Sequence, residues 1–207
     1  MSMEPVPREG TDLRRLILDT ARHLLVTDGY KHLSMRKIAR AIGYSATSIY
    51  LHFESKDALV HALIEEGMER MYEAFQAVGA AHPDDPVARL EALCRCYVRF
   101  GLDHPEYYEI MYMLHPEQMQ RFPAEKYRRA RRSLDMIVHT LEEGAARRLL
   151  MVEEPLLTAS AIWATLHGVV TLVFSRRVDV RVETERLVEA ALGQVMRACA
   201  PVTSSAW

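Results

Sequence analysis

Hydroxyl-bearing, aromatic and basic side chains gather in one short stretch of the chain, between residues 45 and 56, which reads S-A-T-S-I-Y-L-H-F-E-S-K. Hydroxyl groups suit the hydrogen-bonding edges of bases, and a threonine methyl suits the methyl group of thymine. Tyrosine, histidine and lysine suit phosphate oxygens. The pattern therefore points to non-covalent recognition of double-stranded nucleic acid. The candidates for these contacts are Arg36, Ser45, Ala46, Thr47, Ser48, Tyr50, His52 and Lys56.

The residues around this stretch predict two short helices joined by a tight turn. Ser34 is a plausible N-cap, and apolar side chains recur at the spacing of one helical face through residues 35–42. Gly43 falls where a helix stops, because glycine adopts the left-handed conformation without strain. Ser45 can then cap a second helix that turns Ile49 inward. Helix, short glycine-containing turn and helix form a helix-turn-helix, whose second helix enters a major groove.

The residues also match a known pattern in register. From Ser34 to Leu59 the string S-x-R-x-I-A-x-x-x-G-Y-S-x-x-x-I-Y-x-H-F-x-S-K-x-x-L resembles the DNA-binding domain of TetR-family transcriptional regulators, and the match extends from about Asp12 to Leu63. Thr47 departs from the pattern, which usually has glycine there. The resemblance implies an N-terminal three-helix domain that binds a double-stranded DNA operator. In the alternative interpretation these polar residues are merely exposed, and Tyr50 belongs to the core.

Composition and charge set wider bounds. The chain has 207 residues, 49% of them hydrophobic and 26% charged, as in ordinary globular proteins. The net charge is −2, and the slight basic excess of the N-terminal sixty residues supports DNA binding only weakly. The N-terminus lacks the apolar core of a signal peptide, and no run of eighteen apolar residues occurs. Three cysteines fit a reducing cytosol. We therefore expect a cytoplasmic protein with no membrane span.

The rest of the chain predicts only helices, including a long basic one from Pro123 to about Leu150 and a strongly apolar one from Pro155 to about Ser175. The expected fold is all-α. We expect a flexible arm over 1–10, a helix-turn-helix domain over 11–60, a helical domain over 61–200 and a tail over 201–207. The motif W-x-x-x-H-G-V-V-T-L from Trp163 and the stretch H-P-E-Y-Y-E-I-M-Y from His104 resemble the W-H-G subgroup of TetR-family C-terminal domains. That resemblance implies dimerisation and ligand binding.

Aromatic and methionine side chains in this half could line a cavity for a small hydrophobic or aromatic effector. In the alternative interpretation the same stripe is core packing. The candidates are Tyr97, Phe100, Tyr107, Tyr108, Met111, Met136, Trp163 and His167.

The last two predicted helices are the candidates for a homodimer interface, because a four-helix bundle can form from two such helices of each subunit. Alternatively, the terminal helix folds on its own subunit. The candidates are Leu166, Gly168, Val173, Leu187, Ala191, Leu192, Val195 and Met196.

Other functional classes lack support in the sequence. It contains no glycine-rich phosphate loop, no nucleophile motif and no cluster with metal-ligand spacing, so we expect neither an enzyme nor a bound metal or cofactor. The interpretation that unites these features is a dimeric repressor that binds a palindromic operator and is released by a small ligand. The alternative is a regulator of the same fold that activates transcription or responds to a protein partner.

Overall fold

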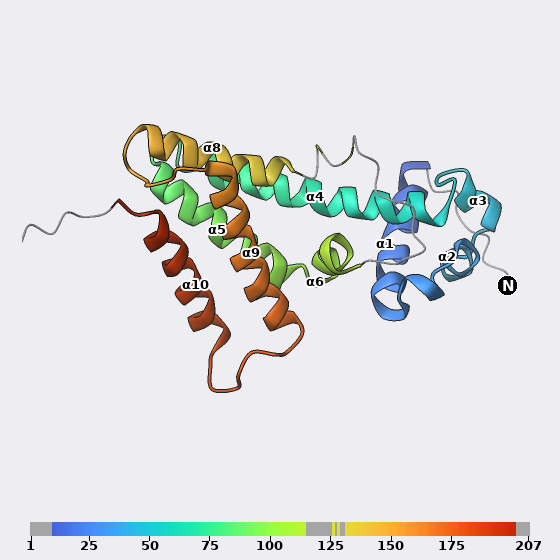
Figure 1. Ribbon diagram of the computed structural model, residues 1–207. Helices are drawn as coiled ribbons and strands as arrows, with labels where there is room; N and C mark the ends of the chain where they lie inside the picture. Colours follow the sequence, from blue (N-terminus) through green and yellow to red (C-terminus); the bar gives the residue numbers. More distant parts are fainter. Residues whose placement is uncertain (1–9, 115–125, 127, 129–130, 202–207) are drawn as a thin grey trace, which may run out of the picture. The chain divides into compact units, whose positions relative to one another are not determined.

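The computed structural model describes residues 10–114, 126, 128 and 131–201, and every element within these ranges is helical (Figure 1). The predicted all-α class is therefore confirmed. The expected arm over 1–10 and the tail over 201–207 lie almost wholly outside the described residues, as does the predicted helix start at Pro123.

The described chain divides into two compact units. The first contains the residues up to Gly67 together with those from Glu106 to Leu114, and the second contains Met68–Pro105 and the described residues beyond 125. The elements of the first unit are α1 (Gly10–Asp28), a 3-10 turn (Tyr30–His32), α2 (Met35–Ile42), α3 (Ala46–Tyr50), the first half of α4 (Lys56–Ala80), α6 (Pro105–Tyr108) and a π-helical turn η2 (Glu109–Met113).

Side-chain caps set the limits of the helices that form the predicted helix-turn-helix. The backbone N–H of Lys37 donates to Ser34 Oγ at 3.2 Å, and that of Ser48 donates to Ser45 Oγ at 3.1 Å. Gly43 has a φ of 75° and ends α2 in the left-handed conformation. The three predicted helix boundaries are therefore confirmed.

A small apolar core holds the first three helices together. Ile17 of α1, Ile38 of α2 and Ile49 of α3 are each fully buried, and α2 packs against both α1 and α3. Leu59 and Leu63 bring the start of α4 into the same unit, both at 0% exposure. Burying these side chains removes apolar surface from water and fixes the orientation of α3.

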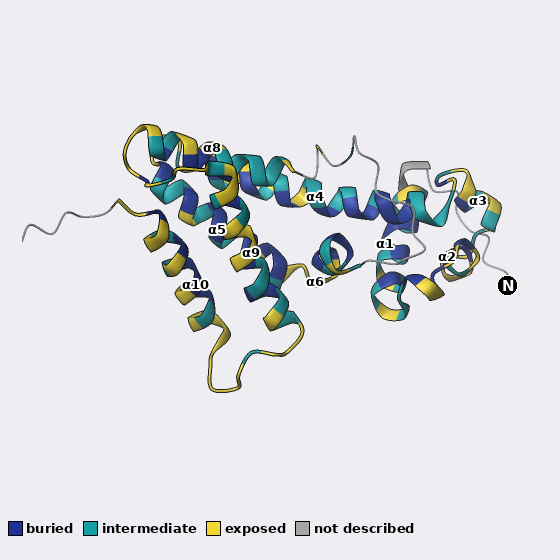
Figure 2. Cartoon of the chain, in the orientation of Figure 1, coloured by how far each residue is buried: buried dark blue, intermediate teal, exposed yellow. Residues whose placement is uncertain are grey.

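The second unit consists of the rest of α4 with α5 (Pro86–Asp103), α8 (Arg132–Ala146), α9 (Pro155–Phe174) and α10 (Thr184–Cys199). α9 packs against α5, α8 and α10 (Figure 1). Buried and exposed residues alternate around α10, as its amphipathic sequence requires (Figure 2).

α8 ends four residues before the predicted boundary at Leu150. Arg148 takes a φ of 58°, the Leu149 N–H donates to the Gly144 carbonyl at 2.8 Å, and the Arg148 N–H donates to Ala145 at 2.9 Å. These two bonds form a Schellman motif. The left-handed residue in it is an arginine and not the usual glycine, so no glycine in the sequence marked the end of α8. The turn buries Leu150 to 4% exposure.

α9 is the described helix that is long and apolar enough to cross a membrane, judged by length and composition alone. Scattered threonines and His167 interrupt its apolar residues, so no uninterrupted apolar run of eighteen occurs, although the mean hydropathy of its most apolar window is still 1.7. Only 28% of its most apolar window is buried. The core helix of a soluble protein passes the same test, so the finding is weak evidence for a membrane; it shows chiefly that α9 keeps an apolar surface uncovered within its unit.

Candidate functional site

The candidate DNA-contacting residues centre on α3, whose two sides differ sharply. Ile49 is fully buried, whereas Tyr50 is 53% exposed and Thr47 is exposed. Because Thr47 and Tyr50 are three residues apart, they lie on one face of the helix. The alternative that places Tyr50 in the core is therefore wrong, and its hydroxyl lies at the surface together with Thr47.

The residues at the start of α3 have a structural task as well. Ser45 is exposed, but its hydroxyl caps the helix and lies 2.8 Å from the Ser48 hydroxyl. Ala46 and Ser48 are half-buried. Alanine at this position leaves room for the backbone of α3 to come close to another molecule.

The basic candidates differ in how they are held. Arg36 is exposed on α2, and His52 is half-buried after α3. The Lys56 ammonium donates to the Tyr30 carbonyl at 3.1 Å and lies 3.7 Å from the centre of the Tyr30 ring. Burial and a hydrogen bond to Asp57 raise the pKa of Tyr30, so this tyrosine stays neutral. Lys56 therefore anchors the start of α4 to the 3-10 turn, a role that its sequence position did not reveal.

A partly buried cluster of charged side chains joins α1, α4 and α6 within the first unit. The Tyr107 hydroxyl donates to Glu66 Oε1 at 2.6 Å and accepts from Arg22 at 2.5 Å. The Arg22 guanidinium also lies 4.6 Å from the centre of the Tyr107 ring and pairs with Glu106 at 3.2 Å. Arg15 pairs with the same Glu66 oxygen at 2.6 Å. This cluster fixes α6 to the first and fourth helices.

The eight candidate ligand residues divide between the two units. Tyr107, Tyr108 and Met111 belong to the first unit, where Tyr108 is fully buried and Met111 packs against Gly67. Tyr97, Phe100, Met136, Trp163 and His167 belong to the second unit. Their assignment to a ligand stays a prediction.

Three of the second group form a hydrogen-bonded aromatic cluster. Trp163 Nε1 donates to the Tyr97 hydroxyl at 3.0 Å, and that hydroxyl lies 3.3 Å from His167 Nδ1. The Trp163 and His167 rings are 5.3 Å apart between centroids. Burial lowers the pKa of His167, so the imidazole is neutral at physiological pH. Trp163 remains 38% exposed, so the cluster has an edge at the surface of its unit.

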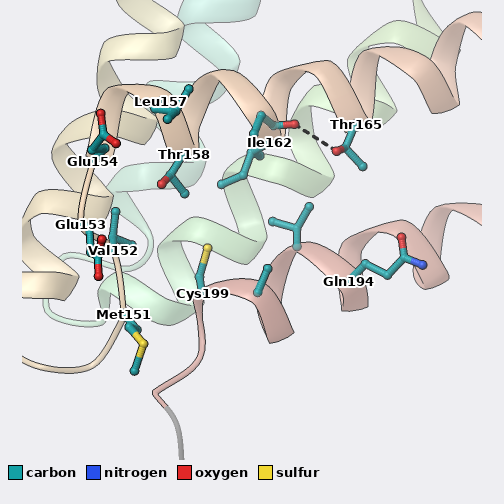
Figure 3. A pocket seen from close by; sticks show the side chains of 13 residues that line it. Met151, Val152, Glu153, Glu154, Leu157, Thr158, Ile162, Thr165, Gln194 and Cys199 are labelled. Atoms are coloured by element: carbon teal, nitrogen blue, oxygen red, sulfur yellow. Dashed lines mark hydrogen bonds between the residues drawn. The ribbon is translucent and has the colours of Figure 1, made fainter.

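A hollow of about 500 Å³ lies elsewhere in the second unit, between α9, α10 and the segment that precedes α9 (Figure 3). None of the eight candidate ligand residues lines it. Its walls are mostly apolar, with two glutamates at the start of α9. The lining residues are Met151, Val152, Glu153, Glu154, Leu157, Thr158, Ala161, Ile162, Thr165, Gln194, Val195, Ala198 and Cys199.

Four of the eight candidate dimer residues are deeply buried within the chain, and the other four are half-buried. Leu166 and Leu192 are only 1% and 2% exposed within the chain, so they pack inside the unit and have little surface for a second subunit. The sequence shows the apolar stripe but not which side of it the subunit itself covers, and the assignment of a dimer interface to these helices stays a prediction. Ala191 and Val195 are nearly as buried, at 6% each. Gly168, Val173, Leu187 and Met196 are half-buried.

The surface that α9 and α10 leave uncovered consists of neighbouring residues. Leu157 is 61% exposed, Leu172 is 44% exposed, and Ala161 and Ala198 are also exposed. An alanine added at Gly168 would meet nothing within 4 Å. The spacing of four residues from Leu157 to Ala161 was available in the sequence, but only the packed structure shows that this face is the open one.

Among the described residues, no group of three histidine, cysteine or acidic side chains is arranged to hold a metal ion. Cys94 is buried, and burial raises the pKa of its thiol to about 12.

Two family models match the chain. Residues 17–63 match the model of bacterial regulatory proteins of the tetR family, and residues 90–195 match a tetracyclin repressor-like C-terminal domain. The chain belongs to the TetR family. The resemblance to the W-H-G subgroup remains a prediction, because the C-terminal model is described only in those broader terms.

Relatives of this TetR-family chain agree with the assignment. Over 58 residues, or 28% of the chain, it is 47% identical to the HTH-type transcriptional repressor Rv1474c of Mycobacterium tuberculosis. Over 74 residues, or 36% of the chain, it is 32% identical to the HTH-type transcriptional regulator UidR of Escherichia coli. The matches cover 31% and 38% of these two relatives' lengths, so they concern one part of each protein.

A likeness over the whole chain comes from a solved structure of a Rhodococcus sp. RHA1 protein of unknown function. Its TM-score is 0.81 and its identity 28%, with 95% of this chain and all of that chain covered. The helical C-terminal half therefore shares the fold of a known protein, not only the helix-turn-helix.

Proposed function

We propose that this TetR-family chain is a transcriptional repressor of the cytoplasm, not a membrane protein or an enzyme, that binds a palindromic DNA operator as a homodimer. The observation that carries the proposal is the exposed face of α3, where Thr47 and Tyr50 lie side by side on a helix capped by Ser45. Rv1474c, to which 58 residues of this chain are similar, is described as a repressor. A dimer would place its two α3 helices at half-sites about 34 Å apart.

The proposed contacts differ in kind and can be separated by binding measurements. Tyr50→Phe removes one neutral phosphate contact, so binding to all sequences should weaken while its salt dependence stays the same. Arg36→Ala removes a cation, so the slope of log affinity against log salt should fall by about one per contact. Thr47→Ala should change the preferred operator sequence more than the affinity for unrelated DNA.

The matched control is Thr27→Ala. Thr27 is exposed in the same unit but lies at the end of α1, where its hydroxyl bonds the His23 carbonyl at 2.9 Å. Fluorescence anisotropy on operator and scrambled duplexes gives the readout. If Thr47→Ala and Thr27→Ala bind every duplex alike, Thr47 does not read the operator.

The proposed dimer uses the open face of α9 and α10, including the hollow between them. This face is mostly apolar, and among the described residues Leu157, Ala161 and Ala198 on it are exposed. Ala161→Glu and Ala198→Glu would bury a charge in such an interface and should yield monomers by light scattering. Ala80→Glu, at an exposed alanine at the end of α4, is the control and should stay dimeric. A wild-type monomer at micromolar concentration would contradict the dimer.

The proposed effector is a small hydrophobic or aromatic molecule bound at the Tyr97–Trp163–His167 cluster. In this cluster the polar atoms of Trp163 and His167 both lie within hydrogen-bonding distance of the Tyr97 hydroxyl, and the Trp163 and His167 rings lie next to each other. A ligand can release DNA only if it binds the released state more tightly than the bound one. Operator release by a panel of hydrophobic compounds, lost in Trp163→Phe, would support the site. No release by any compound would favour a regulator without a small-molecule effector.

A further inference from the structure

Leu51 is a large apolar side chain with almost no cover. It is 81% exposed, directly after Tyr50 at the end of α3. Between residues 13 and 67, all of which are described, Tyr50 and Leu51 are the two large hydrophobic side chains with high exposure. In this part of the first unit, large and highly exposed hydrophobic side chains are therefore confined to the end of the candidate recognition helix.

The backbone places Leu51 on the same face as the proposed base contact. Its φ and ψ are −66° and −23°, and its N–H donates to the Thr47 carbonyl at 3.1 Å, so it continues the helical geometry. Residues three and four apart share a helix face, which aligns Thr47, Tyr50 and Leu51. The other side of this segment is anchored by Ile49 and Phe53, which are 0% and 5% exposed.

Leu51 therefore contributes little to the core, and its chemistry limits what it can recognise. A leucine side chain has no hydrogen-bonding group, so it cannot bind a phosphate oxygen or the polar atoms of a base edge. On the major-groove edges of the bases, the apolar group is the C5-methyl of thymine. 5-Methylcytosine carries a methyl group at the same ring position.

We propose that Leu51 is a specificity-determining residue that packs against the 5-methyl group of one pyrimidine in each operator half-site. The inference rests on the proposed function, because it needs α3 in a major groove. Thr47 and Leu51 are four residues apart, a rise of roughly 6 Å along the helix axis. At about 3.4 Å per base pair, the methyl group lies within about two base pairs of the position that Thr47 contacts.

The test replaces thymines of a bound operator one symmetric pair at a time by deoxyuridine, which removes only the methyl group. For the wild-type protein, one pair should stand out, with affinity falling about fourfold per half-site, the effect of exposing one buried methyl. For Leu51→Ala the same replacement should have no effect, since the methyl has already lost its partner. Leu51→Met, which keeps the apolar volume, should retain the dependence.

A second arm identifies the source of the methyl group. At the sensitive position, a C·G pair is tested with plain cytosine and with 5-methylcytosine. A methyl-dependent gain in the wild type and none in Leu51→Ala would extend the contact to 5-methylcytosine; no gain in either protein would restrict it to thymine. Leu149→Ala, at a leucine 39% exposed in the second unit, controls for general loss of apolar surface.

The outcomes separate the two proposals. If wild-type protein finds no specific operator, the proposed function fails before Leu51 is tested. If it binds an operator but no thymine methyl matters, or if the methyl effect persists in Leu51→Ala, the assignment of Leu51 is wrong and the repressor stands. Melting curves accompany each variant; Leu51→Ala should melt with the wild type, since exposed substitutions shift stability by about 0.5 kcal/mol or less.

Discussion

The Tyr107→Phe substitution removes one hydroxyl group, and it should lower the free energy of unfolding far more than the loss of an exposed hydroxyl would. The hydroxyl bonds both Glu66 and Arg22, whose side chains are only 16% and 15% exposed. Phenylalanine keeps the ring under the Arg22 guanidinium, so the change removes the hydroxyl group and the hydrogen bonds that it makes. Because Arg22 and Glu66 have little exposure, water cannot easily replace the hydroxyl, and both charged groups lose a hydrogen-bonding partner.

The size of the effect follows from the charge of the partners. Hydrogen bonds to charged groups contribute about 1.5–3 kcal/mol each, and the variant retains the direct attraction between Arg22 and Glu66 at 3.8 Å. The expected loss is therefore about 1.5–3 kcal/mol in total. For a chain of this length that lowers the melting temperature by roughly 3–12 °C. Circular dichroism during heating and in urea would measure it.

Tyr72→Phe is a closely matched control. Tyr72 also lies under an arginine, Arg132, at 4.1 Å, but its hydroxyl accepts a hydrogen bond from the exposed and uncharged Gln76 amide at 3.3 Å. This control should cost less than about 0.5 kcal/mol. Equal and small losses in the two variants would refute the claim that the charge cluster holds α6 in place.

Three further predictions concern stability and reactivity. Gly144→Ala places a Cβ 2.4 Å from Leu150 Cδ1 and 3.1 Å from Leu150 Cβ, so overpacking of about 1–3 kcal/mol should exceed the gain of about 1 kcal/mol in helix propensity and lower the urea midpoint. Cys94 should escape iodoacetamide in native protein at about pH 8, as read by mass spectrometry, because burial raises its pKa to about 12; labelling without unfolding would contradict this. Burial tends to raise the pKa of Asp19, but hydrogen bonds from Arg15 and Arg22 outweigh it and lower the pKa below 3.8. The unfolded state then takes up the proton first, so Asp19 stabilises the fold above about pH 4 and loses that effect as the pH falls through its native pKa. The melting temperatures of wild type and Asp19→Asn should converge in acid; a constant difference would exclude this titration.

Local signals in the sequence predicted the elements well, because the interactions that end a helix are close in sequence. Ser34 and Ser45 cap the helices that their positions indicate, and Gly43 takes the left-handed conformation. The end of α8 was missed because Arg148 takes the same conformation without being glycine. Here the packing of Leu150 outweighs the backbone preference.

The sequence predicted the candidate sites less completely than the helices, because the sites depend on contacts between residues that are far apart in the chain. The helical periodicity predicts that Ile49 faces the core, and it therefore also predicts that Thr47 and Tyr50, on another face of the helix, are exposed. No local pattern shows that Tyr107 binds Glu66, 41 residues away in the chain. The stripe on α10 likewise did not reveal that Leu192 faces its own subunit. Such assignments need the positions of several helices at once.

The most direct test of the repressor is a gel shift of the purified protein on DNA flanking its own gene, with excess unrelated DNA as competitor. The account predicts a complex at a palindromic site that survives the competitor, and its loss or altered sequence preference in Thr47→Ala but not in Thr27→Ala. No binding at low salt, where even non-specific affinity should be visible, would contradict the assignment of α3 to DNA.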